Sequence, residues 1–552
     1  MNKKLLWALI GIVAVGGGVF AYMKYFGASE KHLSIVPIDA AIVVGFDLKS
    51  LADKSDYKGK FKSTKLYQYF EKQSKQSSGD DVQDKILGSV LKDPIGSGLS
   101  LGSKVYVFIT SNSNAKYICT VAALNDENNF ADMMAKSGVK SKLEKSKSMS
   151  YYKVGDKELL CWSNKGLLYM STVNHEGMGF EAPVDLVAEA EKMMGQEDSK
   201  SILGSVYFKQ AVKKQKDISM FFNYGSYFKI AGSVAQTAQL EGFSQSFNGV
   251  FALANLEFEK DKIALTSEMI GEKEAIEKLQ MTKSDGIGSH ALQCISDGDV
   301  LSMFSLNLET NKVINLLDDM LKPTVELKTS LNSLAEMSGV KYEDLVAALS
   351  GEMTFSLSGF ESISVIQPSF EINEATGQYE MIQKSKTVTM PKINMALGIK
   401  NKAIIDRLLE QTKVPVENDM RIIAIPLVSG MNIYLVSKDQ VLFLSNVESF
   451  GRTVQSKGKL GDLSNKKVKD LAKDHSSAFY MNLDMNKYES LFSGAGQQDD
   501  KSVNQMKAYM SIFTDVQGTG NSKSSEYIVN LKSGEGNSLY RLLKQADVLD
   551  IE

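Results

Sequence analysis

The chain has 552 residues, 43% of them hydrophobic and 23% charged, and its formal net charge at pH 7 is −3. This composition is typical of a globular protein, and the length is enough for roughly two to four domains with separate cores. Because the two signs of charge nearly balance, the chain lacks the basic footprint of a nucleic-acid-binding protein, and no nucleic acid partner is expected.

Residues 1–32 are predicted to form a membrane anchor. Lys3 and Lys4 precede an uncharged apolar stretch, Leu5–Tyr22, which is close to the shortest length that spans a bilayer. The basic start should stay cytoplasmic, which places the rest of the chain on the extracytoplasmic side. A cleavable signal peptide is the alternative. The sequence Phe26–Ala28 is a poor cleavage site, so an uncleaved signal-anchor is favoured.

One short stretch recurs along the chain. It reads DAAIVVGFDL at Asp39–Leu48, DVLSMFSLNL at Asp299–Leu308 and DHSSAFYMNL at Asp474–Leu483, and a looser copy, ISMFFNY, ends at Tyr224. Large apolar residues alternate in each copy, which predicts a strand with one face on a core. The residues expected to face that core are Val44, Phe46 and Leu48, then Phe304, Leu306 and Leu308, and finally Phe479, Met481 and Leu483.

A short polar residue stands near the end of each of these strands: Asp47, Asn307 and Asn482. As a functional set, they would supply carboxylate or amide ligands. The alternative is capping and turn chemistry, because Asp and Asn side chains accept hydrogen bonds from free backbone N–H groups where a helix begins. The second interpretation is favoured.

The predicted elements of the first half follow in chain order. After a helix at 49–57, they are a polar helical region at 60–91, a hairpin around the turn SNSN within 104–124, a helix at 125–138 ended by Gly138, two or three strands within 151–173, a helix at 182–194, the ISMFFNY strand, and a pair of strands at 249–258 and 262–270.

The second half repeats this order. The segment LLYMSTV, which ends at Val173, is echoed by VLFLSNV, which ends at Val447, and Phe130 and Met134 correspond to Ile405 and Leu409. Landmarks that recur in one order indicate a repeat. We therefore expect an α+β protein with two tandem homologous units, 33–285 and 290–552, each a mainly antiparallel sheet with helices packed on one side.

The two halves differ most where the tight SNSN turn of the first is replaced by a long insertion at about 362–392 in the second. The alternating runs SFEI and YEMI flank NEATGQ, which is typical of a turn, so an extended hairpin arm is expected. Two interpretations stay open. In the first, the arm binds a partner or pairs with another sheet, and in the second it is a hairpin folded over its own sheet without a role in binding.

No residue is assigned to a catalytic, cofactor-binding or metal site. The histidines His32, His175, His290 and His475 are far apart in the sequence, and Cys119, Cys161 and Cys294 are expected to be buried free thiols. Met133, Met134, Met193 and Met194 are expected in the core, and the basic run AVKKQKD at 211–217 is expected to be a solvated helix face. The glycines of GSGLSLG lack the setting of a dinucleotide site, and SDGD at Ser296–Asp299 is only a fragment of a calcium loop.

The run VPIDAAIVVGFDLKSLADKS at Val36–Ser55, with LGSKVYVFI, LGIKNKAIIDRLL and the insertion around NEATGQYEMI, resembles a family of envelope proteins of Bacteroidota called domain of unknown function 4836. The resemblance covers most of the chain after the anchor. It implies export across the membrane and supplies no catalytic residues. Many members look like lipoproteins, whereas no cysteine follows the apolar stretch here.

These observations favour a membrane-anchored, extracytoplasmic protein of the cell envelope that is not an enzyme, has no cofactor, and binds or scaffolds a protein partner. A carrier of lipids or other hydrophobic ligands, or a chaperone-like protein, is the first alternative. A hydrolase whose site is assembled from distant acidic residues is the second.

Overall fold

The computed structural model describes residues 30–545 apart from 57–58, 61–63, 65–67, 69–88, 91–92, 94–95, 101, 113–114, 138–141, 173–183, 236–246, 297–299, 322–326, 373–376, 413, 425–431, 462–465 and 491–500. Residues 1–29 of the predicted anchor therefore lie outside the described residues. Most of the polar helical region and Gly138 lie outside them as well. Among the helices that the structure describes, none is long and apolar enough to cross a membrane.

The fold is α+β and mostly antiparallel sheet, as predicted. The chain divides into two compact units, one formed by Met1–Glu277 with Ser533–Glu552 and the other by Lys278–Lys532. The predicted boundary at 285–290 lies near this division. Residues 533–545, the described part of the last segment, were expected in the second unit and instead belong to the first.

The first unit contains a ten-stranded antiparallel ladder in the order β10-β9-β8-β1-β2-β3-β7-β6-β5-β4. The hairpin predicted around SNSN is β2 with β3. The strands are β1 (Ile42–Phe46), β2 (Val105–Ser111), β3 (Lys116–Ala122), β4 (Glu144–Lys145), β5 (Ser150–Lys153), β6 (Glu158–Ser163), β7 (Gly166–Thr172), β8 (Ile218–Asn223), β9 (Val250–Phe258) and β10 (Lys262–Gly271).

Several helices of the first unit begin where a short polar side chain caps them. Asp126 accepts from Asn128 N and Asn129 N at the start of α5, and Asp185 does the same for α6. The described helical segments are η2 (Lys31–Ile35), α2 (Leu48–Lys54), α5 (Glu127–Lys136), α6 (Leu186–Gly195), η4 (Asp198–Lys200), η5 (Ile202–Gly204), α7 (Val206–Val212), α8 (Tyr224–Ala235), α10 (Lys273–Leu279) and α20 (Ser538–Gln545).

Two separate cores lie on the two faces of this sheet. Val43, Phe108 and Cys119 face a core completed by η2, α6 and α7. The buried His32 and Leu33 belong to η2, so the folded unit begins before the predicted anchor boundary at residue 32. The prediction that helices pack on one side of the sheet is therefore wrong for this unit.

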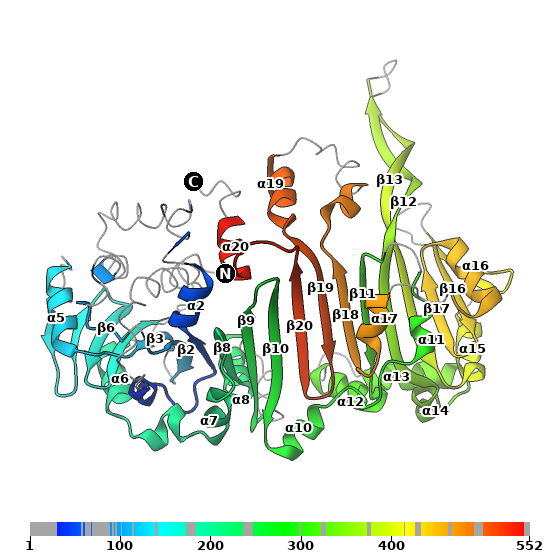
Figure 1. Ribbon diagram of the computed structural model, residues 1–552. Helices are drawn as coiled ribbons and strands as arrows, with labels where there is room; N and C mark the ends of the chain where they lie inside the picture. The colour runs from blue at the N-terminus through cyan, green and yellow to red at the C-terminus, as the bar shows by residue number, and fades with distance from the viewer. Residues whose placement is uncertain are drawn as a thin grey trace. The chain divides into compact units, whose positions relative to one another are not determined.

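The opposite face is covered by helices from both ends of the unit (Figure 1). Trp162, which is 1% exposed, lies 5.3 Å from the ring of Phe130 on α5, and Leu51 on α2 and Leu539 on α20 belong to the same core. Backbone contacts hold α20 in place, since Ser538 N donates to Glu259 O at 2.9 Å. The C-terminal segment thus completes the first unit.

The second unit repeats the pairing of the first strand for strand, in the order β20-β19-β18-β11-β12-β13-β17-β16-β15-β14, and all pairs are antiparallel. Its strands are β11 (Ser302–Asn307), β12 (Leu349–Ile372), β13 (Tyr379–Ile399), β14 (Val416–Glu417), β15 (Met420–Ala424), β16 (Asn432–Lys438), β17 (Val441–Ser445), β18 (Ser477–Asn482), β19 (Phe513–Gly520) and β20 (Ser524–Leu531).

Helices cover both faces of the second sheet as well. Val436 and Phe443 face α11 and α16, whereas Leu435 and Ile399 lie in a core with α14 and α15. The described helical segments are α11 (Ser289–Leu292), α12 (Thr310–Leu321), α13 (Leu327–Met337), α14 (Tyr342–Ala347), α15 (Lys402–Gln411), α16 (Glu448–Lys457), α17 (Lys466–Ala472), η6 (Met485–Tyr488) and α19 (Lys501–Met510).

The face assignment of the recurring strands is wrong in the second unit. Phe304 and Met481, expected in the core, are 38% and 37% exposed, while Met303 and Ser305 are buried. Alternation of large apolar residues identifies the better covered face only when the other face is polar. Here both faces are apolar and both are covered, but to different extents. The pattern therefore predicted the strands correctly and assigned the wrong face to the core.

We predict that Leu539→Ala lowers the free energy of unfolding of the first unit by about 2–4 kcal/mol, because Leu539 is 7% exposed in the core around Trp162. The chain has two tryptophans, so Trp162 fluorescence in a Trp7→Phe background reports on this core during denaturation. Lys544→Ala, at an exposed position of the same helix, is the control and should change stability by less than about 0.5 kcal/mol. Equal stability of the Leu539 variant and the parent would show that α20 is not part of the first core.

Candidate functional site

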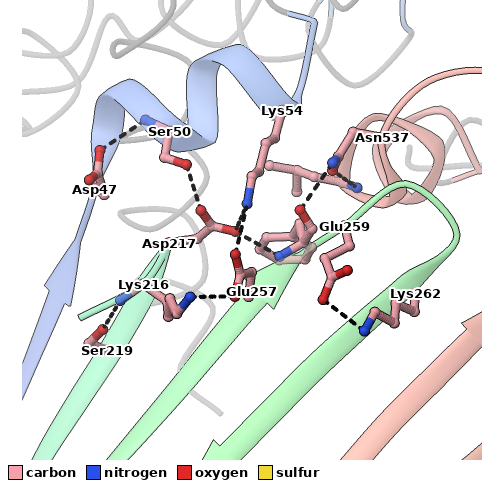
Figure 2. A network of polar contacts seen from close by, with 12 residues as sticks. Asp47, Ser50, Lys54, Lys216, Asp217, Ser219, Glu257, Glu259, Lys262 and Asn537 are labelled. Carbon is pink, nitrogen blue, oxygen red and sulfur yellow. Dashed lines mark hydrogen bonds and ion pairs between the residues drawn. The ribbon is translucent and has the colours of Figure 1, made fainter. Parts of the chain in front are cut away.

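A cluster of charged side chains joins α2 to β8 and β9 in the first unit (Figure 2). Asp217, only 3% exposed, accepts hydrogen bonds from Ser50 Oγ at 2.5 Å, Lys54 Nζ at 2.7 Å and Phe258 N at 2.7 Å. Its backbone carbonyl accepts from Asp47 N at 2.9 Å. A buried carboxylate needs such partners, and here they come from two segments that are far from Asp217 in the sequence.

The same cluster continues to the surface through Glu257. Its carboxylate lies 3.0 Å from Lys216 Nζ and 4.0 Å from Lys54 Nζ. The hydrogen bond with Glu257 raises the pKa of Lys216, so this lysine stays protonated and is no general base. Asp217 is paired with Lys54 and Glu257 with Lys216, so the charged groups of the cluster neutralise one another and anchor α2 on the sheet.

The burial of Asp217 was not predicted from the sequence. The run AVKKQKD was expected to be a solvated helix face, but α7 ends at Val212 and Asp217 is buried at the start of β8. A charged residue just before a strand carries no local sign of burial, because its partners Ser50 and Lys54 come from a distant helix.

The three polar residues proposed as ligands have separate structural roles. Asp47 caps α2 by accepting from Ser50 N at 2.9 Å, and Asn482 Oδ1 accepts from Asp484 N in a turn, as the capping interpretation predicted. Asn307 caps no helix. Its amide donates to Gly286 O at 2.9 Å and ties β11 to the loop before α11.

The predictions for cysteine and methionine are confirmed. Cys119, Cys161 and Cys294 are buried free thiols, and burial raises the pKa of each, that of Cys294 to about 12. These thiols stay protonated and unreactive at neutral pH. Met134, Met193 and Met194 are at most 2% exposed, and Met133 packs partly buried against the core around Trp162.

The remaining motifs do not form a site among the described residues. His32 is buried and its Nε2 lies 2.9 Å from Lys104 O, while His175 and most of SDGD lie outside the described residues. Gly98 of GSGLSLG has a φ of +72° and leaves no room for a side chain, since a Cβ would lie 2.3 Å from Asp126 O. No group of three or more His, Cys, Asp or Glu within the described part of the chain is placed to hold a metal ion.

The hairpin arm is the most distinctive surface of the second unit. β12 and β13 pair with each other from Phe360–Pro391 to Ile372–Tyr379, whereas β11 pairs with β12 only as far as Leu357. The arm, defined here as 360–372 with 379–391, therefore extends beyond the neighbouring strands (Figure 1). It confirms the hairpin predicted at about 362–392.

A bulge and a side-chain clip fix the base of the arm. The register of β12 shifts between Leu357 and Phe360, where Gly359 has a φ of +82°. Beside β13, the side-chain amide of Asn446 accepts a hydrogen bond from Ile393 N at 2.7 Å and donates one to Pro391 O at 2.8 Å. These are the two backbone groups that a residue of a neighbouring strand would otherwise bind. The arm thus leaves the sheet in a defined direction.

The two faces of the arm differ in polarity. The register is unbroken along it, so opposite residues share a face and successive residues alternate. One face, called here the apolar face, has five exposed large apolar side chains: Ile366 (47%), Phe370 (69%), Ile372 (55%), Tyr379 (74%) and Met381 (69%). The other, called here the charged face, includes the Glu371–Lys384 ion pair and Lys386.

A shallow depression of about 300 Å³ lies at the base of the charged face. It is lined by Glu361, Ile363, Asn432, Tyr434 and Asn446–Ser449. The Glu448 carboxylate already accepts from Arg452 Nε at 2.7 Å, and among the described lining residues there is no histidine or cysteine. The depression therefore lacks a base paired with a nucleophile.

We predict that Asp217→Ala lowers the free energy of unfolding of the first unit by about 2–4 kcal/mol, because it leaves the Lys54 ammonium and Phe258 N without their buried acceptor. Chemical denaturation followed by Trp162 fluorescence measures the effect. Glu259→Ala removes the exposed Glu259–Lys262 pair seen in Figure 2 and should cost less than about 1 kcal/mol. If both variants lose the same small amount, Asp217 does not anchor α2.

The profile of the family described as "Domain of unknown function (DUF4836)" matches residues 32–539. None of the curated proteins matches the chain. A solved structure titled "Structure of crystal form I of TP0453" is 10% identical, with 45% of this chain and 81% of that chain covered and a TM-score of 0.24. Since the family match spans nearly the whole chain, this protein belongs to the family of domain of unknown function DUF4836.

Proposed function

We propose that the chain is a non-enzymatic binding or scaffolding protein of the cell envelope, held to the membrane by its N-terminal segment, and that the apolar face of the arm docks a protein partner. The observation that carries this proposal is the concentration of exposed large apolar side chains on one face of a projecting hairpin. Contiguous apolar surface of this kind marks interaction sites in soluble domains.

The stability of the arm supports docking. An isolated two-stranded ribbon is marginally stable in water, and a hydrophobic face needs a second layer to contribute to stability. At its base the charged face has such support, since Val365, which lies opposite Lys386, is 1% exposed. On the apolar face, Phe370 and Tyr379 remain at least 69% exposed, so a partner that covers them supplies the missing layer.

The chemistry of the arm favours a protein over the lipid interior. Within the described residues, neither edge of the distal arm pairs with another strand, so it has unpaired backbone groups. Such groups cost several kcal/mol each in hydrocarbon. Pro368 and Pro391 lack an N–H, which makes both strands poor templates for strand addition. Docking therefore uses the face and not the edges.

A hydrophobic-ligand carrier is the second candidate, and one observation favours it. Phe304 of β11 lies opposite Phe355 and Phe479, and both Phe304 and Phe355 are 38% exposed on one sheet face of the second unit. This row lies on the sheet and not on the arm. If this row of rings were a lipid-binding site, the protein would retain extractable lipid whether or not the apolar face of the arm is altered.

The tandem homology of the two units is also part of the proposal. Each of the ten strands of the first unit has a counterpart with the same neighbours in the second, and α5 and α15 present matching buried residues, Phe130 and Met134 against Ile405 and Leu409. The pairings support an internal duplication in which only the second copy acquired an arm.

We predict that Phe370→Ser with Met381→Ser reduces the recovery of cross-linked partner at least tenfold when the full-length protein is pulled down from its native membranes, because large exposed side chains carry most of the energy of such an interface. Deletion of Val365–Thr389 should abolish recovery.

Met337→Ser is the matched control for this experiment. Met337 is 72% exposed, close to the 69% of Met381, but it belongs to α13 and not to the arm. The control should leave partner recovery unchanged. An unaltered partner set in the Phe370 and Met381 variant would rule out docking through the apolar face, and lipid that stays bound in all variants would favour the carrier.

A further inference from the structure

We infer that the partner of the apolar face is a second copy of this chain, with the two arms packed face to face about a two-fold axis. This inference rests on the proposed docking function of the arm and names its occupant. Three properties of the apolar face, namely its charge, the arrangement of its rings and its area, each fit self-association.

The first property is the absence of charge. The residues that share the apolar face with Phe370 and Met381 are uncharged, and include Ser364, Gln383 and Ser385. Charged residues of the arm, such as Lys384, alternate with these and lie on the other face. In a two-fold interface the same patch occurs on both partners, so charged groups near the axis face their own kind. A neutral face avoids that repulsion.

The second property is the diagonal placement of the aromatic rings. Phe370 lies opposite Met381, and Ile372 lies opposite Tyr379, so these four residues form two successive rows on one face. A two-fold axis along the strands places Phe370 on Met381 of the other copy and Ile372 on Tyr379. An axis across the strands places Phe370 on Ile372 and Met381 on Tyr379.

Either axis therefore stacks each ring of one copy on an aliphatic side chain or a thioether of the other. Contacts of this type are favourable, since aliphatic groups fill the space beside a ring and sulfur packs well against aromatic edges. If both rings were on the same strand or in the same row, one of the two axes would place ring against ring. The pattern is thus complementary to itself.

The third property is area. Aromatic side chains bury about 150–250 Å² each when fully covered, and the four residues of the two rows, two of them aromatic, are 55–74% exposed. Covering them removes about 500 Å² from each copy and about 1,000 Å² in all, which is at the lower limit of specific protein–protein interfaces. Ile366, 47% exposed on the same face, extends the contact.

Cysteine cross-linking in the full-length protein tests this inference. Facing sheets pack about 10 Å apart, so a bis-maleimide of that span should join two Met381→Cys chains in intact membranes. The native cysteines are buried and protonated, which keeps the background low. The expected product has twice the 60.7 kDa mass and contains two differently tagged copies when both are expressed together.

Lys384→Cys, on the charged face, is the matched control and should give at least tenfold less of this dimer. Ile372→Cys is a second reporter on the apolar face and keeps the test valid if the Met381 variant folds poorly. Cross-linking of Met381→Cys to a different protein would overturn the second-copy inference and leave the docking function standing. Absence of the dimer from both apolar-face variants, with full labelling of the cysteines after denaturation, would overturn the second-copy inference. The docking function would then be judged by the pull-down with the Phe370 and Met381 variant, which does not require a cysteine on the partner.

Discussion

Two-sided burial of the sheet is the constraint on which this structure depends. In each unit the strands have apolar residues on both faces, so each ladder needs two layers of helices to exclude water. In the first unit one of those layers is incomplete until the C-terminal segment returns and places Leu539 beside α2 and α5. The buried Asp217 serves the same end, because it fastens α2 over the sheet. The arm is where the strands of the second unit leave their covering layers.

Much of the fold could be predicted from local pattern. Alternation and turn residues identified the β2–β3 hairpin, the strands β5 to β10 and the arm, because these features depend on residues close in sequence. The side of each sheet that is better buried could not be predicted, since Met303 and Phe304 are both apolar neighbours and only tertiary packing decides between them. The position of α20 in the first unit and the burial of Asp217 depend on partners far away in the chain, so no local signal indicates either. For the arm, sequence predicted a hairpin and left its role open, because alternation in SFEI and YEMI does not reveal whether the apolar side is covered.

The contrast between the polar cluster and the arm explains why binding is the function proposed here. Around Asp217, charged groups satisfy one another within a single unit, and their energy is used to hold a helix in place. On the arm, the clip formed by Asn446 holds the base, while apolar side chains beyond it have no described neighbour that covers them. The first arrangement is complete without a partner. The second gains stability only when another surface supplies the missing layer.

Amide hydrogen exchange of the arm tests this account most directly. The full-length protein would be compared in the membranes to which it is proposed to be held and after purification at high dilution in detergent, with the cross-strand amides of 366–372 and 379–383 followed by mass spectrometry. If a partner covers the apolar face, opening of the ribbon is suppressed, and these amides exchange at least tenfold more slowly in the membranes, while the core strand β6 behaves alike in both samples. Equal exchange of the arm in the two samples would contradict the account, because it would mean that the apolar face is uncovered where the protein works.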